Sequence, residues 1–204
     1  MKGNLFIITS PSGGGKGTLI KRVLPTIENL SYSVSYTTRK MRVGEIDRRD
    51  YFFVSVDEFK KLIENNEFLE FAEVHKNFYG TSKRQVEKET DEGNDIILEI
   101  DVQGAEEVQK KLPNSIGIFI LPPSYKVLAE RLIERNTESQ ENLTVRLNNA
   151  KEEVKRYSEF DFIVVNDELE KATEDLRSII LAERLKRDRQ IYLIQDILNT
   201  FENY

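Results

Sequence analysis

The amino-acid sequence predicts an α/β fold: a parallel-sheet core with helices on both faces, an inserted subdomain of short strands, and a lid. Three observations lead to this prediction. Short apolar runs alternate with stretches of helical periodicity along most of the 204 residues, a pattern typical of parallel α/β cores. A glycine-rich loop separates the first apolar run from the first helical stretch, and the segment 33–81 follows a pattern of its own.

The apolar runs are predicted to form the core strands. They read "LFIIT", "IILEI", "IGIFIL" and "FIVV", at 5–9, 96–100, 116–121 and 162–165. Runs that are apolar at nearly every position suit strands buried on both faces, whereas a strand with one solvated face alternates apolar and polar residues.

Helices are predicted between these runs. The first covers 16–24 and ends before Pro25; the others cover 103–111, 124–135, 142–158 and about 168–198. Within 182–201 the apolar residues Leu185, Ile191, Ile194 and Leu198 recur at near-helical spacing. Such a face either packs on the core or contacts another subunit, and the sequence leaves both interpretations open.

The segment 33–81 is interpreted as the inserted subdomain. Its strand-like pieces "SVSYTT", "YFFV" and "FLEFAEV" are separated by charged turns, with one helix near 57–65. The polar stretch 134–145, bounded by helical patterns, is interpreted as the mobile part of a lid that spans 126–147. The core then comprises 1–32, 82–125 and 148–204.

The composition predicts a soluble protein. Hydrophobic residues make up 39% and charged residues 32%, and the formal net charge of −6 argues against a protein that coats nucleic acid or membrane. The absence of cysteine excludes disulfides and thiolate metal sites and fits a reducing compartment. The apolar stretch near the N-terminus is too short for a signal-peptide core or a membrane span, so we expect a cytoplasmic protein.

The loop "TSPSGGGKGT" at 9–18 is interpreted as a phosphate-binding loop. Its three glycines, Gly13, Gly14 and Gly15, allow backbone N–H groups to turn toward phosphate oxygens. Lys16 and the start of the following helix add positive charge. The general pattern is altered at Ser10, where the first glycine usually stands, and at Gly17, which moves the metal-binding hydroxyl to Thr18. The alternative is a glycine-rich turn without ligand, but a strand before and a helix after favour a nucleoside triphosphate.

The inserted subdomain contains a second set of candidate ligands for an anion. Arg39 and Arg42 follow a Ser/Thr-rich strand and precede an aromatic pair, so their planar guanidinium groups could converge on one phosphate. The alternative for this charged run is a solvated turn. Glu70 stands between Leu69 and Phe71, which predicts a carboxylate in a partly apolar pocket or, alternatively, an exposed strand glutamate. His75, the only histidine, receives no role.

Seven segments together resemble guanylate kinases. They are "SPSGGGKGTL", "SVSYTTRKMRVGE", "YFFVSVDEF", "FLEFAEVHKNFYGTS", "LEIDVQG", "IFILPPS" and "VNDEL", in the order and near the spacing of that family. The resemblance covers about residues 5–185 and implies transfer of the γ-phosphoryl group of ATP to GMP or dGMP, with Mg²⁺. It implies nucleobase contacts from Ser35, Glu70, Thr81 and Asp101. It implies GMP-phosphate contacts from Arg39, Arg42, Tyr51 and Tyr79.

The same resemblance implies a donor site on the core. ATP contacts fall on Ser12, Gly13, Gly14, Gly15, Lys16, Gly17, Thr18, Asn166 and Asp167. The lid arginines fall on Arg135 and Arg146, and Arg131 lies one helical turn before Arg135. Thr18 and, through water, Glu99 are the candidate Mg²⁺ ligands. Surface salt bridges are the alternative for each arginine.

The chain departs from the family pattern at several positions. Glu99 replaces the usual aspartate and lengthens the arm toward the metal. The usual Gly-Arg-Gly of the lid reads Glu134-Arg135-Asn136, and a glycine expected before Tyr51 is replaced around Arg48. These substitutions put reaction rates in question rather than the reaction, because they remove no charged contact.

Two rival functions remain at this point. A guanylate-kinase-like binding module that recognises proteins is disfavoured, because Lys16, Arg39, Arg42 and Glu70 are all present. A kinase for another nucleoside monophosphate shares "GKGT". Glu70 with Ser35 favours guanine, whose pairing edge presents two donors to an acceptor-only carboxylate. Subunit association is left open.

Overall fold

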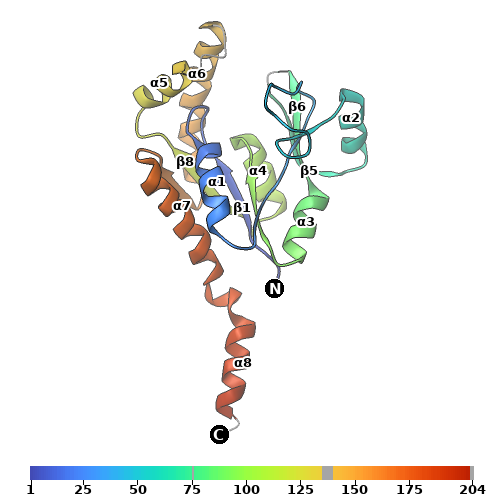
Figure 1. The fold of residues 1–204 in the computed structure, drawn as a ribbon, viewed down its shortest axis with the longest axis vertical. Helices are drawn as coiled ribbons and strands as arrows, with labels where there is room; N and C mark the ends of the chain where they lie inside the picture. The colour runs from blue at the N-terminus through green and yellow to red at the C-terminus, as the bar shows by residue number, and fades with distance from the viewer. Residues whose placement is uncertain (75, 135–139, 203–204) are drawn as a thin grey trace.

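The core of the molecule is a five-stranded parallel sheet (Figure 1). The computed structural model describes residues 1–74, 76–134 and 140–202. The strand order across the sheet is β2 (Leu30–Tyr32), β7 (Asp95–Glu99), β1 (Leu5–Thr9), β8 (Ile116–Leu121) and β9 (Phe162–Val165). All neighbouring pairs in this sheet are parallel, so the loops that follow the strands meet at one edge, where open parallel sheets bind ligands.

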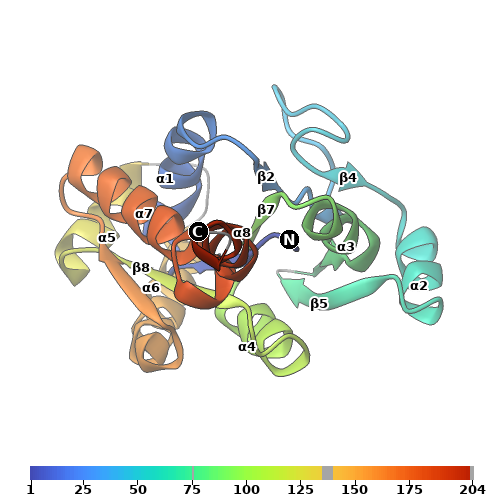
Figure 2. The same ribbon diagram turned by 90° about the horizontal axis from the view of Figure 1, so that it is seen from below.

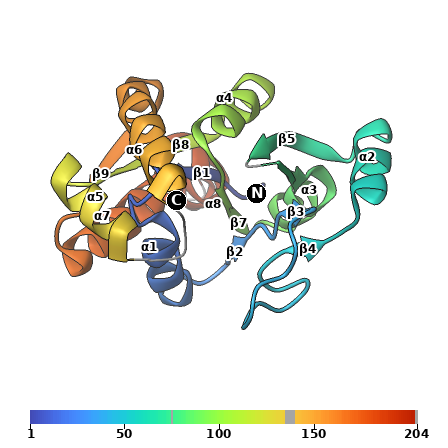
Figure 3. The ribbon, with the colours of Figure 1, turned by 90° about the horizontal axis from the view of Figure 1, so that it is seen from above.

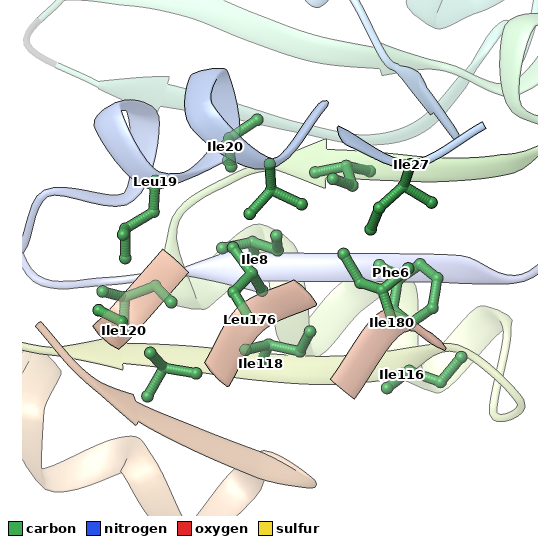
Figure 4. Close-up of a cluster of buried hydrophobic side chains, with 14 residues drawn as sticks. Phe6, Ile8, Leu19, Ile20, Ile27, Ile116, Ile118, Ile120, Leu176 and Ile180 are labelled. Carbon is green, nitrogen blue, oxygen red and sulfur yellow. The ribbon is translucent and has the colours of Figure 1, made fainter. Parts of the chain in front are cut away.

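Helices cover both faces of this sheet (Figure 2). Successive residues of β1 point to opposite faces: Phe6 and Ile8 pack with α1 (Lys16–Val23) and α7 (Leu169–Arg184), as Figure 4 shows. Leu5 and Ile7 pack with α3 (Lys83–Asp91) and α4 (Val102–Lys111) on the other face. This double coverage explains why the core strands are apolar at nearly every position.

A second, four-stranded sheet lies beside the core (Figure 3). Its order is β4 (Phe52–Phe53), β3 (Tyr36–Thr37), β6 (Asn77–Ser82) and β5 (Phe68–Val74). The helix α2 (Val56–Glu64) begins with a capping box formed by Ser55 and Glu58, and its Phe59 ring stacks on Phe68 with ring centroids 4.6 Å apart. Aromatic packing therefore gives this small sheet a core of its own.

Two further helices stand beside the glycine loop. They are α5 (Tyr125–Glu134) and α6 (Gln140–Lys155), and α6 is followed by the short 3₁₀ helix η2 (Arg156–Glu159). Leu128 and Leu132 of α5 pack on Ala150 of α6. None of the helices described in the chain is both long and apolar enough to cross a membrane.

The strands expected at 5–9, 96–100, 116–121 and 162–165 are confirmed within one residue, as are the fold class and the helix near 57–65. Three elements had not been expected. β2 has only three residues, β6 has six residues and pairs antiparallel with β5, and α3 buries only Val86 and Thr90 in an otherwise polar sequence. Each of the three carries too little apolar periodicity for sequence analysis to detect.

The single helix expected over 168–198 is wrong. The helix α7 ends at Arg184, the 3₁₀ helix η3 (Arg187–Arg189) follows, and α8 (Ile191–Glu202) is a separate element. Arg184 holds the end of α7 in place: its Nε donates to Asp95 Oδ2 at 2.7 Å and its Nη2 to the Glu28 carbonyl at 2.9 Å. Of the two interpretations left open for the tail, packing on the core is excluded, because Leu185 and Ile191 are exposed.

Candidate functional site

The loop after β1 has the backbone geometry of an anion cradle. Gly13 and Gly15 have φ values of +86° and +91°, a region that residues with a Cβ rarely occupy. The Gly14 N–H donates to the Pro11 carbonyl at 2.9 Å, which closes the turn before α1 begins at Lys16. The N-terminus of α1, with its partial positive charge, therefore lies at the mouth of the loop.

Gly15→Ala is expected to damage this loop, and Gly44→Ala provides a matched control. Both glycines have φ near +90°, but a Cβ on Gly15 would lie 2.2 Å from Asn166 Nδ2, whereas a Cβ on Gly44 would meet nothing within 4 Å. Alanine should cost about 1–2 kcal/mol of unfolding free energy at Gly44 from backbone strain alone and about 2–4 kcal/mol at Gly15. Urea denaturation measures both, and equal losses would show that the Asn166 contact is unimportant.

Glu99 lies between the loop and the strand edge. Its carboxylate is 3.8 Å from Lys16 Nζ and accepts a hydrogen bond of 3.1 Å from the Tyr32 hydroxyl. Gly17 allows this approach, because a Cβ there would lie 3.3 Å from Glu99 Oε1. Glu99 thus lies beside Gly17 and Lys16 at the start of α1, and its carboxylate oxygens are ligands of the kind that a hard cation such as Mg²⁺ prefers. Within the described part of the chain no group of three His, Cys, Asp or Glu residues could hold a metal by itself.

A central cavity of about 440 Å³ lies between the glycine loop, the second sheet and α6. Residues from distant parts of the sequence line it. The expected site residues among them are Ser12, Lys16, Ser35, Tyr51, Tyr79, Glu99, Asp101 and Arg146. The cavity therefore joins the candidate phosphate loop to four of the eight expected GMP residues, whereas Arg39, Arg42, Glu70 and Thr81 are not among its lining residues.

A second cavity of about 340 Å³ lies on the other side of the loop. Gly13, Gly15, Thr18, Arg131, Asn166 and Asp167 are among its lining residues. Asn166 Nδ2 donates to the Gly14 carbonyl at 2.8 Å, and Arg131 Nη2 donates to the Asn166 carbonyl at 3.0 Å. Arg131 Nη1 is buried without a hydrogen-bond partner, and an unpaired buried donor on a cation is suited to receiving an anionic ligand.

Glu70 is buried, with 5% of its surface exposed, which excludes the exposed-strand alternative. Its Oε1 accepts a hydrogen bond of 2.5 Å from the Thr81 hydroxyl. Burial raises the pKa of the Glu70 carboxyl to about 7, and the nearby Asp101 adds to the rise. Asp101 itself caps α4 by accepting from the Gly104 N–H at 2.8 Å. Glu70 also lies close to Gly104 of α4, since a Cβ on Gly104 would lie 2.8 Å from Glu70 Oε2.

Arg39 is held by a carboxylate. Its two terminal nitrogens donate to Glu45 at 2.7 and 3.0 Å, and its guanidinium carbon lies 5.3 Å from the centre of the Tyr51 ring. Glu45 also accepts from the Arg42 N–H at 2.7 Å. The Arg39 hydrogen bonds hold the pKa of Glu45 below its usual range. Arg39 is thus oriented beside the tyrosines, as an arginine that binds phosphate needs to be.

Two expected residues have no side chain in this arrangement. The Arg42 side chain is exposed and only its backbone N–H contacts Glu45, the partner of Arg39. Arg135 lies outside the described residues, as does the departure at Asn136.

Sequence analysis missed two acidic residues of the site. Glu45 pairs with Arg39. Its position in the same basic segment, three residues after Arg42, could have indicated an acidic partner for these arginines. Glu153 of α6 accepts from the Ser12 N–H at 3.2 Å, and burial raises the pKa of its carboxyl. No local signal could have found Glu153, because 141 residues separate it from Ser12.

The fold and the site together define an α/β protein with a glycine-rich loop after its first core strand and a cavity on each side of that loop. The model of the guanylate kinase family matches residues 2–183. The chain is 52% identical to a guanylate kinase of Neisseria meningitidis over 197 residues, 97% of this chain and 96% of that protein. It is 48% identical to a guanylate kinase of Thermotoga maritima, over 99% of this chain and 96% of that protein.

A solved structure gives the same result. The chain resembles the crystal structure of guanylate kinase from Anaplasma phagocytophilum with a TM-score of 0.77 and 34% identity, over 92% of this chain and 89% of that one. The chain belongs to the guanylate kinase family.

Proposed function

We propose that the protein transfers the γ-phosphoryl group of ATP to GMP or dGMP, giving ADP and GDP or dGDP. The observation that carries this proposal is the buried pair of Glu70 and Thr81 in the second sheet, close to Asp101, which lines the central cavity together with Lys16 of the glycine loop. It combines an acceptor for guanine with a cradle for phosphate in one connected site.

The GMP side is assigned to the second sheet. Glu70 accepts from the N1–H and amino groups of guanine, while Ser35, Thr81 and Asp101 complete the polar surroundings of the base. Adenine would face the carboxylate with the lone pair of a ring nitrogen, so the carboxylate would lack a hydrogen-bond donor. A buried site that is built on such hydrogen bonds therefore discriminates strongly against adenine. Arg39, Tyr51 and Tyr79 receive the GMP phosphate, with Arg42 moving in from its exposed loop.

The ATP side is assigned to the glycine loop. Backbone N–H groups of Gly13, Gly15 and Gly17 bind the outer phosphates and Lys16 neutralises them, while Asn166 and Asp167 border the adenine. Thr18 and, through water, Glu99 would hold Mg²⁺, which would supply charge neutralisation for the ATP phosphates. Arg131, Arg146 and Arg135 are assigned to the transferring group.

The reaction requires no protein base. The attacking oxygen belongs to a phosphate whose second pKa is about 6, so it is largely ionised at neutral pH. Alignment and charge neutralisation then account for catalysis. We further propose that segment 33–81 and the lid 126–147 close onto the core and exclude water, which is a competing phosphoryl acceptor.

A panel of GMP, dGMP, AMP, CMP and UMP tests this proposal, with ADP release measured by a coupled assay. We expect kcat/KM for GMP to exceed that for AMP by about 10³-fold or more, because a site built on buried hydrogen bonds discriminates strongly. AMP turnover as fast as that of GMP would assign the chain to another monophosphate. No turnover of any monophosphate would favour a binding module.

A further inference from the structure

The carboxylate of Glu99 has a different partner at each of its two oxygens. Its Oε1 lies 3.8 Å from Lys16 Nζ, and its Oε2 accepts a hydrogen bond of 3.1 Å from the Tyr32 hydroxyl. Glu99 and Lys16 both line the central cavity. Lys16 is an expected residue of the donor site, whereas sequence analysis gave Tyr32 no role.

The short edge strand β2 brings Tyr32 beside Glu99. Tyr32 pairs with Ile97 of β7 in the parallel register, and Glu99 follows Ile97 by two residues. Residues two apart in a strand point to the same face of the sheet, so Tyr32 and Glu99 are diagonal neighbours on one face. An aromatic side chain is long enough to span such a diagonal, and the Tyr32 hydroxyl does reach the carboxylate.

Packing restrains the Tyr32 ring. The ring is half-buried and packs against the apolar cluster to which Ile97 and, from α1, Ile20 and Val23 contribute. A phenol ordinarily has a pKa near 10, so at neutral pH it is protonated and can donate a hydrogen bond. The core therefore holds a hydrogen-bond donor in place at the far oxygen of Glu99.

A glutamate at position 99 needs such a restraint more than an aspartate would. The glutamate side chain has one more rotatable bond, so fixing its carboxylate costs more conformational entropy. With Oε2 bonded to Tyr32, Oε1 is left facing Lys16 and Gly17 at the start of α1, where a Cβ on Gly17 would lie 3.3 Å from Oε1. The Tyr32 hydrogen bond thus compensates for the longer arm that replaces the usual aspartate of the family.

We propose that Tyr32 is a positioning residue of the donor site, whose hydroxyl fixes the Glu99 carboxylate so that Oε1 can bind the water shell of Mg²⁺ beside the glycine loop. This inference rests on the Mg²⁺ assignment made for ATP under the proposed function. Tyr32 acts on the cation only through Glu99.

Calorimetric titration of the full chain with ATP, in the absence of GMP, tests the proposal. The quantity to compare is the ratio of the ATP dissociation constant in EDTA to that in excess Mg²⁺, which measures how much the metal strengthens binding. Tyr32→Phe should lower this ratio about three- to tenfold, the effect of losing one hydrogen bond. The dissociation constant in EDTA should change less than about twofold.

Tyr36→Phe is the matched control. Tyr36 is also half-buried, but it lies in the second sheet, where its ring stacks on Phe52 with ring centroids 4.6 Å apart. The variant removes the same hydroxyl group from a tyrosine that is not bonded to Glu99, so it should leave the ratio within about twofold of wild type. Circular dichroism checks that each variant is folded.

Glu99→Asp separates positioning from a general structural role. The aspartate carboxylate stands one methylene further from Tyr32 and loses the hydrogen bond to its hydroxyl. In a Glu99→Asp background, Tyr32→Phe should therefore change the ratio less than about twofold, because the two side chains are coupled through that bond. A tyrosine that only supported the fold would lower the ratio equally in both backgrounds.

Two results would overturn the proposal: a Tyr32→Phe protein with the wild-type ratio, or the same loss from Tyr32→Phe in both backgrounds. A wild-type chain whose ATP affinity does not respond to Mg²⁺ would overturn the proposal together with the Mg²⁺ assignment. Phosphoryl transfer to GMP is tested separately by the monophosphate panel, so a failure of the positioning role is distinguishable from a failure of the proposed function.

Discussion

Lys16→Ala is expected to lower kcat by on the order of 10³-fold, the effect of removing a pre-positioned charge from a developing transition state. Lys16 begins α1, directly after the glycine loop, and its Nζ lies 3.8 Å from Glu99. Without the lysine, the Glu99 carboxylate would face the ATP phosphates uncompensated, which adds repulsion to the lost attraction. Single-turnover transfer from ATP to GMP, measured at saturating concentrations of both, gives the rate of the chemical step.

Lys21→Ala is the control for this experiment. Lys21 belongs to the same helix but is exposed and lies in its last turn, so its removal should change kcat less than twofold. A Lys16→Ala enzyme that retains more than a tenth of the wild-type kcat would show that the loop amides and the metal suffice. Lys16 would then have only a minor part in transfer.

Glu70→Gln is expected to lower kcat/KM for GMP by about 10²–10³-fold while KM for ATP changes less than threefold. A glutamine oxygen can still accept from the Thr81 hydroxyl, which now donates to Glu70 Oε1 at 2.5 Å. The amide nitrogen would then present hydrogens toward the two guanine donors, and buried donors without acceptors are costly. Initial rates with one substrate varied at a time separate the two effects.

Glu67→Gln provides the matched control, because Glu67 lies just before β5 and is exposed. It should leave both KM values unchanged. Equal loss of affinity for ATP and GMP in Glu70→Gln would show that Glu70 supports the fold rather than recognises the base.

The raised pKa of Glu70 predicts a pH dependence of GMP affinity. With a pKa of about 7 in the empty protein, the carboxyl is protonated at pH 6, and binding guanine through the carboxylate must release that proton. GMP affinity should therefore fall by about tenfold between pH 8 and pH 6. The GMP phosphate also titrates near 6, so it contributes to the change of GMP affinity with pH as well. Calorimetric titrations with GMP at several pH values separate the two, because the contribution of Glu70 is the pH dependence that the wild type shows and Glu70→Gln lacks.

The same shift has an opposite consequence for the stability of the empty protein. A carboxyl whose pKa is raised from 4.5 to about 7 in the folded state binds its proton more tightly there than in the unfolded chain. Its contribution to stability is complete below pH 4.5 and is lost as the pH rises through 7. Urea denaturation at several pH values, for the wild-type chain and for Glu70→Gln, measures this contribution. The pH dependence of the unfolding free energy that is present in the wild type and absent from Glu70→Gln is the contribution of Glu70.

The sequence by itself determined the core strands, the phosphate loop and the family. Each depends on local order: a strand buried on both faces must be apolar at successive positions, and a backbone that wraps an anion must have glycines at fixed places. Glu70 could be singled out in the same way, because a carboxylate stood between Leu69 and Phe71 in a strand-like segment.

Tertiary structure alone decided the rest. It decided that Glu70 is buried, that Glu45 orients Arg39 and that Glu153 reaches Ser12 across 141 residues. It also decided that the chain turns after Arg184 and sends α8 away from the core. Burial and long-range pairing depend on which elements come together in space, and a periodic apolar face in the sequence is the same whether the fold or another molecule covers it.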